Sequence, residues 1–149
     1  MPEKRNLECR RLTEADGELL AGLLAMSRAG AEAFGLNQAG RHGATGAWGV
    51  FIQGVLCGAA GLAGRRSGRE AEIAFLLVSD AWRNAGVSLL LLDALVREAG
   101  EGGAREVLAR LADGPRSLGE ILADAGFSGP SPKDDAYPAG EWRRGAESR

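Results

Sequence analysis

Apolar residues recur at two spacings along this chain, and these spacings divide it into predicted helices and strands. Positions three and four residues apart predict a helix that follows Thr13, which is suited to cap it together with Asp16. The same spacing predicts a helix over Asn84–Ala99 and a shorter one over Ser117–Asp124, which Gly126 ends. The expected apolar faces of the first two helices are formed by Leu19, Leu20, Leu23, Leu24 and Met26, and by Leu89, Leu90, Leu91, Leu92, Leu95, Val96 and Ala99.

Short apolar runs bounded by polar turns predict the strands. Ala71–Val78 is nearly continuous in apolar residues, as expected for a central strand buried on both faces. Gln53-Gly54 fits the two-residue turn of an antiparallel hairpin, and the polar segment Gly64–Glu70 is predicted to be a turn. The predicted strands are Leu7–Leu12, Ala47–Ile52, Val55–Ala63, Ala71–Val78, Arg105–Leu111 and a last edge strand within Ala136–Arg144.

The order of these elements predicts an α+β domain. Three consecutive strands form a meander, and a β-α-β unit then adds a strand across a helix. Gly30–Ala44 fits a second short helix followed by a loop, and Ser128–Asp135 is a loop rich in Pro and Ser. The sequence contains no internal repeat or linker. We therefore expect one domain over residues 1–149, with a mixed, mostly antiparallel central sheet flanked by helices.

Composition narrows the classes of function. With 149 residues, of which 45% are hydrophobic and 26% charged, the chain is typical of a globular domain. Its net charge of -2 gives no reason to expect a nucleic-acid partner. The charged start of the chain is unlike a signal peptide, and no apolar run approaches the ~20 residues that span a bilayer, so we expect a cytoplasmic protein that does not enter membranes. Cys9 and Cys57 lack the spacing of a metal motif, and no metal is expected.

The stretch Ala71–Ser88 combines two features with chemical potential. Glu72 is the only acidic residue in its apolar strand, and burying a carboxylate is costly unless it is paired or used in chemistry, as a general base would be. Downstream, the Gly86 loop opens a helix, whose first N–H groups and dipole are suited to hold a phosphate. The plain alternatives are a structural turn, and a carboxylate paired with a basic neighbour: Arg65, Arg66 or Arg69.

The same stretch resembles the central motif of the GNAT superfamily of acyl-CoA N-acyltransferases. That motif reads Gln/Arg-x-x-Gly-x-Gly/Ala, and Arg83, Gly86 and Ser88 stand at its positions, with Ser in place of the last Gly or Ala. The order of elements and the Gly126-Phe127 pair also resemble the family. The resemblance implies acetyl-CoA as cosubstrate. Its pyrophosphate would be held by Arg83, Asn84, Ala85, Gly86, Val87, Ser88 and Leu89, and its pantetheine arm and acyl carbonyl by the backbone of Leu76, Leu77 and Val78.

Within the superfamily, Ala71-Glu72-Ile73-x-Phe75 resembles the corresponding strand of members that acetylate protein lysines, where this Glu is the general base. The resemblance therefore implies acetyl transfer to an amine, a protein lysine or a small molecule, by direct attack in a ternary complex with Glu72 as base. Many members also carry a Tyr that acts as general acid and an Asn, where this chain has Leu122 and Pro115. Neither replacement has a side chain that donates a hydrogen bond.

These departures keep two alternatives open. One is a catalytically impaired member of the family, which would serve as an acyl-CoA-binding sensor or interaction module. The other is a structural α+β domain whose resemblance to the family is accidental. The general acid stays unassigned among water, Arg116, Ser117 and Tyr137, and so does the acceptor. A last strand at the sheet edge could pair between chains, so a homodimer is an open expectation.

Overall fold

The computed structural model describes residues 7–26, 33–34, 46–67, 70–79, 82, 86–110, 121–128 and 141–145. Within these ranges the strands form one sheet in the order β1-β3-β4-β5-β6-β7, and the short β2 pairs with β5. The strands are β1 (Leu7–Arg11), β2 (Ala33–Phe34), β3 (Trp48–Ile52), β4 (Val55–Ser67), β5 (Glu70–Val78), β6 (Glu106–Arg110) and β7 (Glu141–Gly145). The helices are a 3-10 turn (Glu14–Asp16), α1 (Gly17–Met26) and α3 (Val87–Glu101), and residues 121–124 are also helical.

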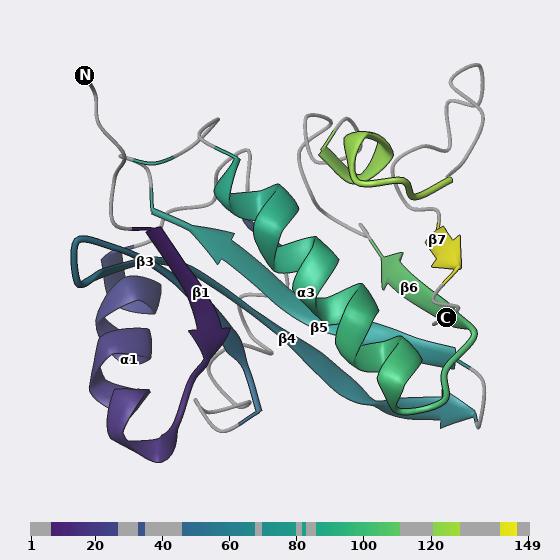
Figure 1. Cartoon of the computed structure of the whole chain (residues 1–149), viewed down its shortest axis with the longest axis horizontal. Helices are drawn as coiled ribbons and strands as arrows, with labels where there is room; N and C mark the ends of the chain where they lie inside the picture. Colours follow the sequence, from purple (N-terminus) through teal and green to yellow (C-terminus); the bar gives the residue numbers. More distant parts are fainter. Residues whose placement is uncertain are drawn as a thin grey trace.

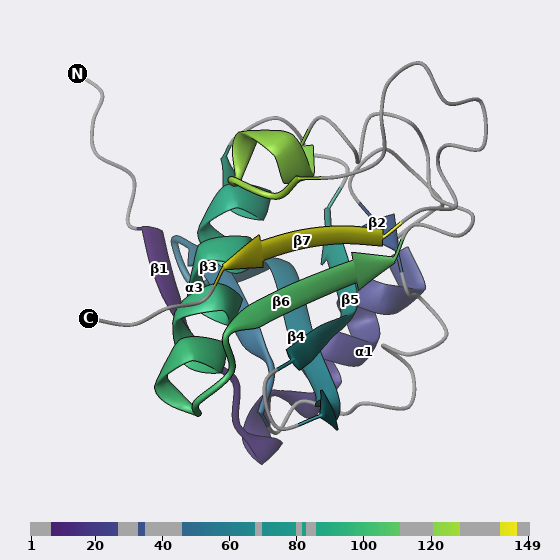
Figure 2. The same cartoon turned by 90° about the vertical axis from the view of Figure 1, so that its right-hand side faces the viewer.

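The sheet lies between two helical layers, with α1 on one face and α3 on the other (Figures 1 and 2). Among the described strands, neighbouring pairs are antiparallel except β5 and β6, which are parallel. The core has two parts: one packs between α3 and the sheet, around Leu91 and Leu95, and the other between α1 and the sheet, around Leu20 and Phe75. The predicted α+β class, with a mixed and mostly antiparallel sheet flanked by helices, is confirmed.

The hairpin of β3 and β4 turns at the predicted residues. Gln53 and Gly54 both have positive φ, 53° and 82°, as a type I′ turn requires. The prediction of a turn from Gly64 was wrong, because β4 continues to Ser67 and pairs with β5 through an irregular register. Backbone pairing with a neighbouring strand carries β4 through a polar sequence that side-chain pattern alone marks as a turn.

The apolar faces of the helices are narrower than predicted. Leu20 and Leu23 of α1 are buried, but Leu19 is 47% exposed. In α3, Leu91 and Leu92 are fully buried, whereas Leu89 and Leu90 are 39% and 37% exposed. A helix on one face of a sheet buries a single stripe, so a run of four leucines necessarily turns two of them away from that stripe.

Two predicted helix boundaries and one predicted helix can be compared with the structure. α3 begins at Val87 rather than at Asn84, which lies outside the described residues. Residues 33 and 34, within the segment predicted to hold a second helix, form the strand β2 instead. The last helix ends as predicted, because Gly126 adopts φ of 94° and Phe127 donates its N–H to the Leu122 carbonyl at 2.9 Å. Its expected cap, Ser117, lies outside the described part of the chain.

The predicted capping pair is present at the start of the 3-10 turn that leads into α1. Asp16 accepts hydrogen bonds from the Thr13 N–H at 2.7 Å and from the Thr13 hydroxyl at 3.2 Å. It also forms a salt bridge with Arg10 of β1 at 3.1 Å. The Arg10 hydrogen bond, followed by the Thr13 backbone bond, lowers the pKa of Asp16 to about 2.

This lowered pKa predicts how stability depends on pH. Because the native state favours the ionised carboxyl, its contribution is present above the ordinary Asp pKa and is lost as pH falls toward 2. Asp16→Asn is therefore expected to melt below wild type at pH 7, and the gap should close as pH approaches 2. Thermal melts of both proteins across this range measure it. A gap that stays constant with pH would assign the effect to the lost cap geometry instead of the charge.

The described ranges contain neither a membrane-spanning helix nor a metal cluster. No helix there is long and apolar enough to cross a membrane. No group of three or more His, Cys, Asp or Glu side chains in the described part of the chain is placed to hold a metal ion.

Candidate functional site

The two parallel strands of the sheet pair over only a short distance. β5 and β6 are in register from Glu70 opposite Glu106 to Glu72 opposite Leu108. β5 then continues to Val78 without β6 beside it, while its other side stays paired with β4. Beyond the last residue that pairs with β6, the same side of β5 pairs with β2 (Figure 2). In this pair Phe34 lies opposite Leu76 and Ala33 opposite Leu77. The end of β5 is therefore bordered by a strand of only two residues.

The hydrogen-bonding phase of β5 determines which backbone groups face this side. The Ser79 N–H donates to the Cys57 carbonyl of β4 at 2.8 Å. Because bonded residues alternate along an antiparallel pair, the groups of Leu77 also face β4, and those of Leu76 and Val78 face away from it. Leu76 thus pairs with Phe34, and Val78 extends beyond the last residue of β5 that β2 reaches.

The chain passes from the end of β5 to the start of α3, whose first N–H groups have no partner within the helix. Gly86 is the N-cap residue, with φ of 82°, and no side chain in the described part of the chain caps the helix. The first turn contains no acidic residue that would compete for its N–H groups. A Cβ built on Gly86 would meet no atom of the described residues within 4 Å, so there is space beside this residue, whose backbone is in the left-handed region. These properties suit an anionic group of a ligand.

Gly58 of β4 allows the start of α3 to pack closely against the sheet. A Cβ at this position would lie 2.7 Å from Cγ1 of Val87, 3.2 Å from Cδ1 of Leu91 and 3.3 Å from the Leu77 carbonyl oxygen. Only a residue without a side chain permits this approach. Val87 and Leu91 are fully buried as a result. Gly58 was not among the residues predicted from sequence, because in a chain with 23 glycines a single one carries little signal.

Glu72 lies at the last position where β5 and β6 pair. Its neighbours Ala71 and Ile73 are buried in the part of the core under α3. Since successive strand residues point to opposite faces, the Glu72 side chain points to the face that carries α1, and it is half-buried there. The side chains of its alternative partners, Arg65, Arg66 and Arg69, lie outside the described residues.

The structure brings several predicted site residues together and leaves others undescribed. Leu76, Leu77 and Val78 end the strand from which the chain leads to Gly86, and Val87 and Ser88 are buried in the first turn of α3. Leu89 is exposed and borders a hollow of about 400 Å³, which is also lined by Asp93, Asp124, Ala125, Gly126 and Arg144. Arg83, Asn84 and Ala85 lie outside the described ranges.

The residue at the expected general-acid position is part of the core. Leu122 is fully buried and packs in the cluster between α3 and the sheet. Pro115 lies outside the described residues. β2, the other neighbour of the site, was missed because two residues without a periodic pattern give no strand signal; only their pairing with β5 defines them.

Comparisons with known proteins agree with this fold. Three solved structures illustrate the likeness of fold. The N-acetylglutamate synthase of Neisseria gonorrhoeae, solved with coenzyme A and N-acetyl-glutamate, has a TM-score of 0.70 at 18% identity over 98% of this chain. The GNAT domain of S. lividans PAT has a TM-score of 0.73 at 20% identity, covering 93% of this chain and 90% of that one. The ribosomal-protein-S18-alanine N-acetyltransferase of Escherichia coli has a TM-score of 0.71 at 12% identity, covering 96% of both.

The chain spans only 36% of the length of the Neisseria synthase, although it covers most of the other two proteins. No curated protein matches it by sequence. The family model described as the acetyltransferase (GNAT) family matches residues 10–126, which is more than half of the chain and contains the parted strands and the start of α3. This chain belongs to the GNAT family of acetyltransferases.

Proposed function

We propose that this protein is an N-acetyltransferase that transfers an acetyl group from acetyl-CoA to an amine, with a protein lysine as the favoured acceptor. The observation that carries the proposal is the juxtaposition of two backbone sites. The end of β5 turns the polar groups of Leu76 and Val78 away from β4, and the chain leads from there to the start of α3 at Gly86, where the first N–H groups of the helix have no intrahelical partner. One site suits an extended amide-containing arm, and the other suits a pyrophosphate.

The helix start would bind the charged end of the cosubstrate. The N–H groups from Gly86 to Leu89, together with Asn84, Ala85 and the cationic Arg83, form the proposed pyrophosphate site. The positive φ of Gly86 and the open space above it allow a phosphate to approach the backbone closely.

The end of β5 would hold the pantetheine arm and the acyl carbonyl. Of the three residues predicted for this task, Leu77 directs its N–H to β4, so Leu76 and Val78 remain as donors to a ligand. Along an extended strand Leu76 lies about 13 Å from Glu72 and Val78 about 20 Å. We therefore assign the acyl carbonyl to the Leu76 N–H, because it is the donor nearer to the proposed base. This assignment requires β2 to release Leu76 when the cosubstrate binds.

Glu72 would act as general base. The incoming amine must lose a proton when it attacks the thioester, and the Glu72 carboxylate, half-buried where β5 and β6 part, would accept that proton through water. The nitrogen forms the new amide bond, the thiolate of CoA leaves, and no covalent enzyme intermediate is needed. The name of the Escherichia coli neighbour shows that a protein amine is an acceptor on this fold.

Two measurements test the proposed function. Titration calorimetry with acetyl-CoA should give saturable heat, and acetyl transfer should then be detected with some member of a panel of lysine peptides and small amines. Absence of both heat and a thermal shift with acetyl-CoA would refute the proposal. Binding without turnover on any amine would favour the second candidate below.

The role of β2 gives a further prediction. In the pair of Phe34 with Leu76 the backbone groups bond to each other, so Phe34→Pro removes one hydrogen bond from β2. If β2 and the cosubstrate compete for Leu76, acetyl-CoA should bind this variant about fivefold more tightly, the equivalent of roughly 1 kcal/mol for one hydrogen bond. Ala33→Pro is the matched control, because Ala33 lies opposite Leu77, whose groups face β4. Equal affinity in the wild type and both variants would show that β2 does not occupy the cosubstrate site.

A second candidate function is an acyl-CoA-binding sensor without turnover. It is favoured by Leu122, which stands where many members of the family carry a Tyr acid and is fully buried in the core. The Leu122 side chain cannot donate a proton. This candidate predicts acetyl-CoA binding in calorimetry and no acetyl transfer.

A further inference from the structure

The outer edge of β1 presents backbone groups that pair with no other strand of the described residues. β1 is the last strand of the sheet on its side, and it pairs with β3. The Leu12 N–H donates to the Ala47 carbonyl at 2.7 Å, which sets the phase of this pair. By alternation Glu8 and Arg10 also bond to β3, and the N–H and C=O groups of Leu7, Cys9 and Arg11 point outward.

The other end of the sheet differs from this edge. β7 pairs with β6, and Arg143 of β7 also exchanges two hydrogen bonds with Ser128, at 2.8 and 2.9 Å. The expectation that the last strand would pair between chains is therefore less favourable than pairing through β1. At the β1 edge the Arg11 carbonyl accepts a 3.0 Å bond from the Arg10 guanidinium, and its second lone pair remains for another donor.

The sequence of β1 is complementary to itself in one register. In an antiparallel pair of two copies with Cys9 opposite Cys9, Glu8 of each copy lies opposite Arg10 of the other. Moving the centre to Glu8 places two glutamates opposite each other, and moving it to Arg10 places two arginines opposite each other. Like charges directly opposite are destabilising in a sheet, and unlike charges are stabilising. Charge therefore selects the register that is centred on Cys9.

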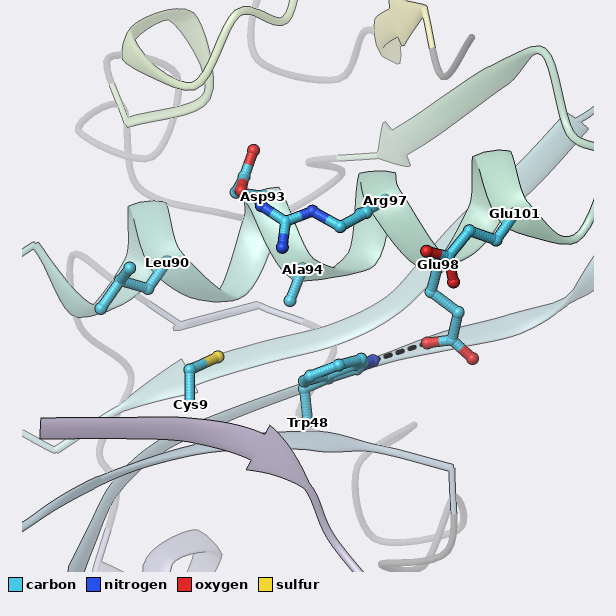
Figure 3. Close-up of a pocket in the computed structure, with 8 residues that line it drawn as sticks. All are labelled: Cys9, Trp48, Leu90, Asp93, Ala94, Arg97, Glu98 and Glu101. Atoms are coloured by element: carbon cyan, nitrogen blue, oxygen red, sulfur yellow. Dashed lines mark hydrogen bonds and ion pairs between the residues drawn. The ribbon is translucent and has the colours of Figure 1, made fainter. Parts of the chain in front are cut away.

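Both faces of β1 suit this arrangement. On the sheet face that carries α1, Glu8 is exposed, and its Oε2 lies 3.9 Å from Nε of Arg10 in the same strand. Pairing would therefore join the charges of two copies into one network. On the face of α3, a groove of about 170 Å³ runs beside the strand between Cys9 and Leu90, as Figure 3 shows. Leu7 is 43% exposed and Leu90 37%, which leaves apolar surface at this edge for a partner to cover.

Trp48 and Glu98 brace the inner wall of the groove. The Trp48 indole N–H donates to Glu98 at 2.6 Å (Figure 3). Glu98 also forms an ion pair with Arg11 at 3.2 Å. These contacts tie the end of β1 to α3. The edge is thus held in an extended form before a partner arrives, which lowers the entropy lost on pairing.

We propose that two copies of this chain associate through β1, as an antiparallel pair of strands centred on Cys9, so that the two sheets become one. The pairing forms six main-chain hydrogen bonds, two between the Cys9 residues and two for each pair of Leu7 with Arg11. A contact of five residues per chain is small compared with a stable interface, so we expect a reversible dimer with a dissociation constant on the order of tens of micromolar.

Sedimentation equilibrium over a concentration series tests this proposal. Wild type should pass from monomer to dimer, and Glu8→Lys should weaken the association at least tenfold, because it places a lysine opposite Arg10 at two points of the strand pair. Glu18→Lys makes the same charge change at an exposed residue of α1, and it should leave the association unchanged. Cys9→Pro is the second variant. It removes an outward N–H and should abolish the dimer without a loss of β3 pairing, which circular dichroism and the melting temperature check.

A disulfide crosslink tests the register centred on Cys9. The protein used for it also carries Cys57→Ala, so that Cys9 is its one thiol. Diamide should take two electrons and two protons from a pair of Cys9 thiols and leave one disulfide, since residues opposite each other in a bonded pair have Cα atoms about 5.5 Å apart. Glu8→Lys should reduce this crosslink in parallel with the dimer. A chain that stays monomeric, or a dimer that persists in Cys9→Pro or fails to crosslink through Cys9, would overturn the proposal. The Glu8→Lys monomer should still transfer acetyl groups. This activity distinguishes a failure of the dimer proposal from a failure of the proposed function.

Discussion

Glu72→Gln is expected to lower kcat for acetyl transfer by about 100-fold or more, and to leave the affinity for acetyl-CoA unchanged. A positioned general base contributes roughly 10²–10⁴-fold to rate, and the amide of Gln keeps the size of the side chain but cannot accept the amine proton. The proposed cosubstrate contacts are backbone groups of Leu76, Val78 and the start of α3, and none of them involves the Glu72 carboxylate. Steady-state kinetics and calorimetry on the same preparation measure the two quantities.

Glu70→Gln is the matched control for this substitution. Glu70 lies two residues earlier on β5 and on the same face, and its carboxylate forms a salt bridge with Arg143 at 3.2 Å. Exposed ion pairs of this kind contribute little, so we expect a rate close to that of wild type. Equal activity of Glu72→Gln and wild type would refute the base assignment. Equal losses in both variants would point to the charge of this strand rather than to proton transfer.

Gly58→Ala is expected to destabilise the fold and to weaken acetyl-CoA binding together. The new methyl group would lie 2.7 Å from Val87 and 3.3 Å from the Leu77 carbonyl oxygen, so the start of α3 must shift away from β4 and β5. Overpacking of this kind costs about 1–3 kcal/mol, which corresponds to a fall in Tm of roughly 3–10 °C. The shift moves the amides at Gly86 relative to the end of β5, and binding should weaken for that reason. Thermal melts and titration calorimetry measure the two effects.

Gly22→Ala provides the comparison for Gly58→Ala. A Cβ at Gly22 meets nothing within 4 Å, and Ala is favoured over Gly inside a helix such as α1. This variant should melt slightly higher than wild type and bind acetyl-CoA equally well. A Gly58→Ala protein with wild-type Tm would show that α3 is not held against β4 as closely as the structure places it. Lower Tm with unchanged affinity would separate the position of α3 from cosubstrate binding.

Much of the fold is determined locally, and for that reason it could be predicted from the sequence. The β3–β4 hairpin follows from two residues that accept positive φ, the start of α1 from Thr13 and Asp16, and the end of the last helix from Gly126. Helical spacing of leucines identified α1 and α3, and continuous apolarity identified β5 as a central strand. In each case the decisive interaction lies within a few residues of the signal.

The candidate site was predicted in part for the same reason. The motif at Arg83, Gly86 and Ser88 marks a helix start, and a helix start exposes its amides wherever it lies. The carboxylate of Glu72 was visible because its two neighbours in sequence, Ala71 and Ile73, are apolar. These signals do not tell which way each backbone group points. The hydrogen-bonding phase of β5 against β4 shows that the groups of Leu77 face β4, whereas those of Leu76 and Val78 face away from it.

The sequence by itself determined the elements, their order and the residue types at the ends of β5 and α3, because turns, caps and periodicity are local. Tertiary structure decided that β5 and β6 part after Glu72, that β2 borders Leu76, and that Gly58 admits the start of α3. It also decided that the two exposed leucines of α3 turn away from the core and that β1 forms a sheet edge. Each of these depends on which distant segments share a hydrogen-bonded edge or a packed face, and no spacing along the chain encodes that partnership.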